Sequence, residues 1–135
     1  MINKIFVNLP IKDLKRSMSF FSELGFTFNK QFTDENAACL VINDDIYAML
    51  LTEKFYQTFI RKEIADSTKV SEVIVALNCE SRGEVDALVE KALKAGAKEY
   101  REPEVYEWMY GRSFEDLDGH LWELGYMDPA HVEPV

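Results

Sequence analysis

The chain has 135 residues, of which 47% are hydrophobic and 29% charged, and its formal net charge is −9. This composition is typical of one ordinary globular domain and excludes a disordered chain. An acidic surface repels phosphate groups, so we expect neither nucleic acid nor an anionic membrane as a partner; it favours cationic ligands or serves solubility alone. We recognise no signal peptide and no apolar run long enough to span a membrane, and therefore expect a cytoplasmic protein.

The two cysteines, Cys39 and Cys79, each lie inside an apolar run. No second cysteine is near either of them, so the spacing of a zinc site or a redox pair is missing. We expect both to be small buried hydrophobic residues.

The first half of the chain predicts a strand, a helix and three further strands. Residues 5–9 are rich in β-forming types and end at Pro10, Asp13 is placed to cap a helix with one apolar face, and Gly25 ends that helix. The three strands that follow are expected at 26–32, 37–42 and 46–52, with a helix over 53–65 and a polar linker at 66–69.

The second half repeats this order. A strand is expected at 73–79, and Ser81 is placed to cap a helix that runs to Ala95, with Glu84 positioned for a capping box. A short strand over 97–100 and two longer strands over 108–117 and 120–126 follow, the last two joined by a hairpin at Asp118-Gly119.

The repeated order predicts an α+β fold, a single domain over 1–135 made of two βαβββ modules at about 1–65 and 70–128. A half of this size buries too little surface to be stable alone. We therefore expect the modules to pack together, with helices outside and strands that curve round a cavity.

Two stretches carry a resemblance to a known family. The first is Asn-Leu-Pro-Ile-Lys-Asp-Leu-Lys-Arg-Ser at 8–17, followed by Phe20-Phe21 and by Leu-Gly-Phe at 24–26. The second is Phe-Glu-Asp-Leu-Asp-Gly-His-Leu-Trp-Glu-Leu at 114–124. Together they resemble the glyoxalase/bleomycin-resistance/extradiol dioxygenase (vicinal oxygen chelate) superfamily, with Leu117 where the family usually has proline. The resemblance implies paired βαβββ modules that form a curved mixed-sheet cup, and a homodimer.

Enzymes of that family hold a divalent metal on His, Gln or Glu side chains from four strands. Carried over to this chain, the four positions fall on Phe6, near Leu50, near Ile74 and on Glu123, so Glu123 is the only family ligand kept. Glu72, at the end of the third of these strands, is a second candidate. We therefore expect no metal cofactor, with a divalent metal as the alternative.

The two histidines, His120 and His131, are expected to be ordinary surface residues rather than metal ligands.

A two-residue loop at Asp118-Gly119 would place Phe114 opposite Glu123 and Arg112 opposite Gly125. Arg112 would then pair with Glu123 or hold an anionic ligand group, or else form a purely structural ion pair on a packed sheet. Glu123 is the candidate catalytic residue, as a general base. The aromatic residues at 106–110 form either a ligand platform or a dimer rim. The predicted ligand-binding residues are Phe6, Asn8, Leu50, Ile74, Trp108, Tyr110, Arg112, Phe114 and Glu123.

Three functions are compatible with these residues. The first, which is the function that we expect, is a metal-free protein that binds a small molecule in its cup and resembles the bleomycin-resistance proteins. The second is a metal-dependent lyase or isomerase that resembles glyoxalase I. The third is a non-catalytic relative that binds a protein partner.

Overall fold

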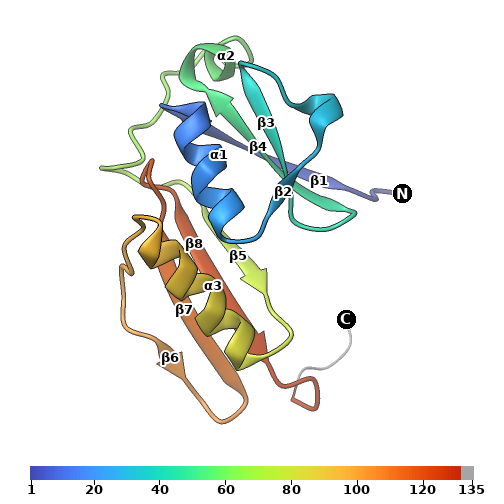
Figure 1. Ribbon diagram of the computed structural model, residues 1–135, viewed down its shortest axis with the longest axis vertical. Coiled ribbons are helices and arrows are strands. Elements are labelled where there is room, and N and C mark those ends of the chain that lie inside the picture. The colour runs from blue at the N-terminus through green and yellow to red at the C-terminus, as the bar shows by residue number, and fades with distance from the viewer. Residues whose placement is uncertain (132–135) are drawn as a thin grey trace. The chain divides into compact units, whose positions relative to one another are not determined.

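The computed structural model describes residues 1–131 (Figure 1). The chain divides into two compact units, Met1–Asp66 and Ser67–Val135, which we call unit 1 and unit 2. The boundary lies within the polar linker predicted at 66–69, close to the predicted module boundaries.

Unit 1 contains one four-stranded mixed sheet. Its strands lie in the order β1-β4-β3-β2; β1 pairs with β4 in parallel and the other pairs are antiparallel. The elements are β1 (Ile5–Ile11), α1 (Leu14–Glu23), β2 (Thr27–Phe28), the 3-10 helix η1 (Lys30–Phe32), β3 (Ala37–Val41), β4 (Ile46–Thr52) and α2 (Glu53–Gln57).

Helix α1 starts and packs as its sequence pattern indicates. The Asp13 side chain accepts a hydrogen bond from the Arg16 backbone N–H at 3.1 Å, which caps the first turn. Phe20 and Phe21 are buried on the apolar face of the helix, and their rings meet edge to face at 4.9 Å.

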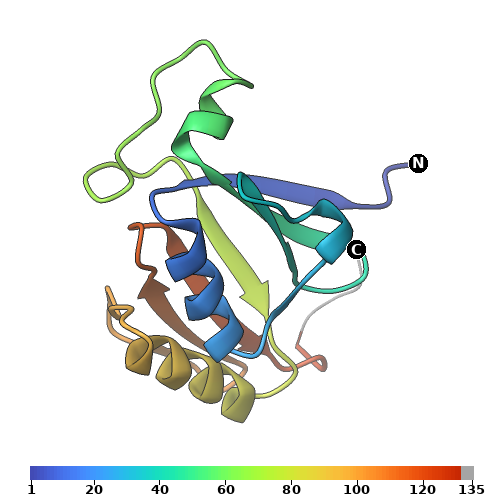
Figure 2. The same ribbon diagram turned by 45° about the horizontal axis from the view of Figure 1, so that its top comes forward.

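Three predicted elements of unit 1 have other bounds. Strand β1 continues through Pro10 to Ile11, which an edge strand tolerates because the missing N–H removes no ladder bond. Only two residues of the predicted strand 26–32 pair with β3, since the chain then turns into η1 (Figure 2). The predicted helix 53–65 ends at Gln57, where the hydroxyl of Thr58 donates to the Phe55 carbonyl at 2.6 Å.

Unit 2 repeats the topology, with strands in the order β5-β8-β7-β6. Strand β5 is parallel to β8, and the other pairs are antiparallel. The elements are β5 (Ile74–Asn78), α3 (Arg82–Lys94), β6 (Glu104–Val105), β7 (Met109–Glu115) and β8 (Leu121–Met127). The predicted α+β fold of two βαβββ modules is confirmed.

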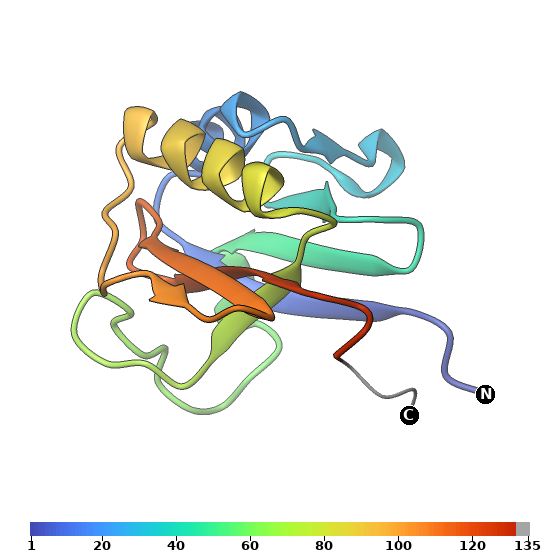
Figure 3. The ribbon, with the colours of Figure 1, turned by 90° about the horizontal axis from the view of Figure 1, so that it is seen from below.

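Helix α3 covers one face of the unit 2 sheet (Figure 3). Ser81 caps it as predicted, by accepting a hydrogen bond from the Glu84 N–H at 3.1 Å. Val85 and Val89 are fully buried on the helix, and Phe114 and Trp122 are buried on the strands, with their rings stacked at 6.2 Å. The predicted strand at 97–100 is reduced to a single bridge between Lys98 and Glu115.

The connection between β7 and β8 is longer than the predicted two-residue loop and spans 116–120. The buried Asp116 carboxylate organises it by accepting hydrogen bonds from the backbone of Asp118 and His120 and from the Trp122 indole. His120 is only 8% exposed, so the prediction that it lies on the surface was wrong. Gly119 has φ +91° and lies directly against the Ser67 backbone.

Among residues 1–131, no helix has the length and apolar character needed to cross a membrane.

Candidate functional site

Alternation along the strands of unit 2 separates two faces of its sheet. The side chains of Trp122 and Leu124 point to the α3 side and are buried, whereas those of Glu123 and Met127 point to the other side, which Gly125 also faces. We call this second side the open face. It also carries Ile74, Ala76 and Asn78 of β5, and Met109, Gly111 and Ser113 of β7.

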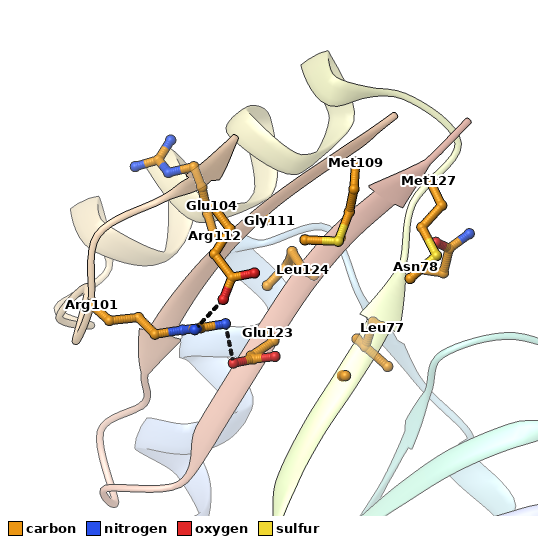
Figure 4. A pocket seen from close by; sticks show the side chains of 12 residues that line it. Leu77, Asn78, Arg101, Glu104, Met109, Gly111, Arg112, Glu123, Leu124 and Met127 are labelled. Carbon is orange, nitrogen blue, oxygen red and sulfur yellow. Dashed lines mark hydrogen bonds and ion pairs between the residues drawn. The ribbon is translucent and has the colours of Figure 1, made fainter. Parts of the chain in front are cut away.

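A pocket of about 380 Å³ lies on the open face (Figure 4). At one end the side chains of Met109 and Met127 border it, together with Asn78. At the other end stand three charged side chains, Arg101, Glu104 and Glu123.

The floor of the pocket is bare backbone. Gly111 of β7 lies directly opposite Gly125 of β8, in the middle of the ladder. A Cβ atom built at either glycine would meet nothing closer than 3.8 Å, and neither residue has a positive φ. Neither local crowding nor backbone conformation therefore requires glycine here. Glycine inside a strand often marks a bulge, a bend, or a place where a ligand or another backbone approaches closely. The β7–β8 ladder is regular at this pair, which leaves the pocket floor without side chains.

Arg101 holds the charged end of the pocket together. Its Nη2 lies 2.7 Å from Glu123 Oε1, and its Nη1 binds the Glu104 carboxylate. Tyr100 Oη donates to Glu123 Oε1 at 3.5 Å, and burial, helped by the negative charge of Glu123, raises the pKa of Tyr100. Tyr100 thus remains a hydrogen-bond donor throughout the neutral range.

Ser113 is a buried polar residue on the same face, directly opposite Glu123 in the β7–β8 ladder. Its side chain is fully buried, and its hydroxyl finds no hydrogen-bond partner among the residues that the structure describes. Such an atom costs about 1–3 kcal/mol when it stays unsatisfied.

The register of the β7–β8 hairpin differs from the predicted one. Ser113, not Phe114, is opposite Glu123, and Leu124, not Gly125, is opposite Arg112. The longer connection at 116–120 causes the one-residue shift, which moves every β7 side chain to the other face. Tyr110, Arg112 and Phe114 were therefore wrongly assigned to the face of Glu123.

Arg112 instead joins β7 to the helix side of unit 2. Its guanidinium contacts Glu99 at 2.8 Å, and Asp86 and Glu90 at 3.0 Å each. Tyr110 donates to Asp86 at 2.5 Å, and this bond, together with Arg112, holds the Asp86 pKa below its usual range. The predicted pairing of Arg112 with Glu123 was wrong, although Arg112 still borders the pocket.

The predicted site residues of unit 1 lie on both faces of its sheet. Phe6 is 47% exposed and stacks on Tyr47 at 4.8 Å, and the exposed Asn8 donates to the Phe6 carbonyl. Leu50 is fully buried opposite Leu9, so its assignment to the cup face was wrong. Its neighbour Met49 occupies the face of Phe6 and Asn8, because Met49 pairs with Asn8 in the β1–β4 ladder.

Trp108 precedes β7 and belongs to a stack of three rings. Its indole lies 5.9 Å from the Tyr106 ring and 5.6 Å from the His131 imidazole, nearly parallel to both. Tyr106 is 53% exposed and Trp108 37%. The two predicted roles of these aromatic residues, ligand platform or dimer rim, stay predictions.

The donor groups of unit 2 do not fit the family-type metal position. Glu123 shares the open face with Ile74, which stands at the neighbouring predicted ligand position and is apolar. The Glu123 carboxylate already binds the Arg101 guanidinium. Glu72 is exposed and precedes β5. Within residues 1–131, no three His, Cys, Asp or Glu side chains come together as a metal-binding group.

Sequence reasoning missed most of the pocket. Arg101 and Glu104 lie in a stretch without hydrophobic periodicity, and no local pattern predicts the contact of Arg101 with Glu123 of β8. Gly111 and Gly125 did carry a signal, since each is an isolated glycine inside a strand pattern.

A family model identifies the family of this chain, and solved structures share its fold. The family model described as the Glyoxalase/Bleomycin resistance protein/Dioxygenase superfamily matches residues 4–124. Among solved structures, hypothetical protein SA1046 from S. aureus is 31% identical, with 93% of this chain and 94% of that chain covered and a TM-score of 0.78. No curated protein matched the sequence.

Two further structures share the fold at lower identity. A glyoxalase-related enzyme from Fulvimarina pelagi is 21% identical, with 93% of this chain and 88% of that chain covered and a TM-score of 0.79. The fosfomycin resistance protein FosX from Mesorhizobium loti is 18% identical, with 96% and 97% covered and a TM-score of 0.68.

Proposed function

Because the chain belongs to the glyoxalase/bleomycin resistance protein/dioxygenase superfamily, we propose that it binds a small organic molecule in the pocket on the open face of unit 2, without a divalent metal. The observation that carries this proposal is the glycine-floored pocket itself. It combines apolar walls with a few placed polar groups, which is the usual make-up of a small-molecule site.

The chemistry around Glu123 supports the metal-free part of the proposal. A guanidinium 2.7 Å from Glu123 Oε1 repels a divalent cation that approaches the same carboxylate. A metal-dependent lyase would also need a ligand where the chain has Ile74.

A library screen tests the binding part. We would measure the change in Tm of the full chain with a diverse set of small compounds, and repeat it with Gly125→Val. The branched side chain fills the floor of the pocket, so compounds that stabilise the wild type should lose their effect in this variant. Ala87→Val, at an exposed position on α3, adds similar bulk away from the pocket and should keep the effect.

The metal-free part needs its own measurement. We would determine bound metals by mass spectrometry on protein purified without chelators, before and after soaking in Ni²⁺, Mn²⁺ and Zn²⁺. The proposal expects much less than one metal per chain. About one equivalent of metal, lost in Glu123→Ala, would contradict it and would favour the glyoxalase-like lyase.

A further inference from the structure

We propose that the pocket selects small aromatic carboxylates, whose anionic group binds Arg101 in the place that Glu104 now occupies. The inference rests on the proposed function, because it names the class of molecule that the same pocket takes. It is carried by the position and the partners of Arg101.

Of the two arginines that line the pocket, Arg101 is the more exposed. Arg112 is only 10% exposed, and carboxylates on the helix side, those of Asp86, Glu90 and Glu99, surround its guanidinium. The Arg101 side chain is 44% exposed and uses one terminal nitrogen for each carboxylate partner. A guanidinium carries five N–H donors and binds a carboxylate best through two parallel hydrogen bonds, which neither contact provides.

The two partners of Arg101 differ in how firmly they are held. Glu123 lies on the inner strand β8, and Tyr100 also donates to it. Glu104 lies on β6, an edge strand of two residues that follows Pro103. Glu104 can therefore turn to water at small cost, whereas Glu123 keeps Arg101 in position beneath the incoming anion.

A cationic ligand group is disfavoured at the same place. The guanidinium lies between the two carboxylates, so a cation that approached either of them would also approach Arg101. The net charge of −9 does favour cations at long range. That field is screened beyond about 8 Å at physiological ionic strength, and the adjacent guanidinium decides which charge is accepted.

The rest of the pocket fits the apolar part of such a ligand. Gly111 and Gly125 leave a floor without side chains, on which a planar ring can lie close to the backbone. Met109 and Met127 border the other end, and thioether sulfur makes favourable contacts with aromatic rings.

Three probes of the same size and different charge test the inference. We would titrate benzoate, benzyl alcohol and benzylamine into the full chain and obtain each Kd by ligand-observed NMR. Benzoate should bind about tenfold tighter than benzylamine, as one additional charge-assisted contact of about 1.4 kcal/mol implies.

Variants of the charged side chains separate the roles. Glu104→Gln removes the competing carboxylate and should tighten benzoate binding by a few-fold. Arg101→Gln should abolish the preference for benzoate and reverse it toward benzylamine, because Glu104 and Glu123 then stand without their cation. Lys98→Gln removes an exposed positive charge from the same unit and should change none of the three affinities.

The outcomes distinguish this inference from the proposed function. Tighter binding of benzylamine than of benzoate in the wild type, with Gly125→Val abolishing both, would overturn the inference and leave the proposed function intact. Equal affinity for all three probes, unchanged in Arg101→Gln, would also overturn it. No binding by any probe, with no stabilising compound in the library screen, would contradict both.

Discussion

The two units of this chain have one topology and different open faces. In each unit, the first strand pairs in parallel with the last, and a single capped helix follows the first strand. Asn8 of β1 and Ala76 of β5 are equivalent positions, each five residues before a helix cap. Asn8 pairs with Met49 of β4, and Ala76 pairs with Glu123 of β8, so Met49 is the unit 1 counterpart of Glu123. The same position therefore carries a thioether in one unit and an arginine-bound carboxylate in the other.

The helix-covered faces differ as well. In unit 1 this face is apolar, with Leu9, Ile11 and Leu50 almost fully buried. In unit 2 the apolar core of Phe114 and Trp122 gives way to the ion cluster round Arg112. Repetition of strand order thus fixes the backbone frame, while side chains at a few equivalent positions decide whether a face is packed, apolar or charged. Substitutions at positions where the two units diverge should therefore change the free energy of unfolding by different amounts.

The largest expected difference in stability is between alanine substitutions at two turn glycines, Gly119 of unit 2 and Gly25 of unit 1. Both have a positive φ, but a Cβ at Gly119 would lie 2.5 Å from the Ser67 carbonyl oxygen, whereas Gly25 faces open space. Gly119→Ala should lower the free energy of unfolding by about 3 kcal/mol, from strain and overpacking together. Gly25→Ala should cost about 1 kcal/mol, from strain alone. Urea denaturation measures both free energies of unfolding. Equal losses of stability would show that the Ser67 backbone moves away from the new Cβ at no energetic cost.

The ion cluster of unit 2 gives the next largest effect. Arg112→Met leaves Asp86, Glu90 and Glu99 without their cation and should cost about 2 kcal/mol at pH 7. Lys15→Met, at an exposed position on α1 of unit 1, should change stability by less than about 0.5 kcal/mol.

The pH dependence of this loss has a definite sign. The hydrogen bond from Tyr110, together with Arg112, lowers the folded-state pKa of Asp86. The stabilisation is therefore present above the unfolded pKa, about 4, and is lost as the pH falls through the folded value. The difference between wild type and Arg112→Met should shrink below about pH 4. A difference that stayed constant down to pH 3 would mean that Arg112 acts through packing rather than charge.

Ser113 gives the smallest effect, and one of opposite sign. Ser113→Ala removes a fully buried hydroxyl that has no partner among the described residues, and should raise the free energy of unfolding by about 1 kcal/mol without ligand. A loss of stability in urea denaturation would show that the hydroxyl is satisfied in solution.

The fold followed from the sequence because its determinants are local. Asp13 and Ser81 cap the helices where expected, and the apolar spacing predicts the buried face of each. The hairpin register could not be predicted from Asp118-Gly119 alone. It depends on Asp116, which reaches forward to the Trp122 indole and lengthens the connection.

The candidate site was predicted only in part. Glu123 was found because it belongs to a motif, and the structure places it at the pocket. Only the fold brings Arg101 to Glu123, and Arg101 comes from a stretch of the chain without a periodic pattern. The predicted position on β4 was wrong by one residue, since Met49 and not Leu50 shares the face of Asn8. Because side chains alternate along a strand, an error of one residue assigns a side chain to the opposite face of the sheet.

Methyl NMR on protein labelled with [¹³C-methyl]methionine tests the central claim most directly, because Met109 and Met127 border the pocket and Met49 lies on the equivalent face of unit 1. We expect benzoate to shift the Met109 and Met127 signals, to leave the Met49 signal unchanged, and to lose its effect in Gly125→Val. Shifts at Met49 without shifts at Met109 and Met127 would contradict this expectation, because the ligand would then lie on unit 1.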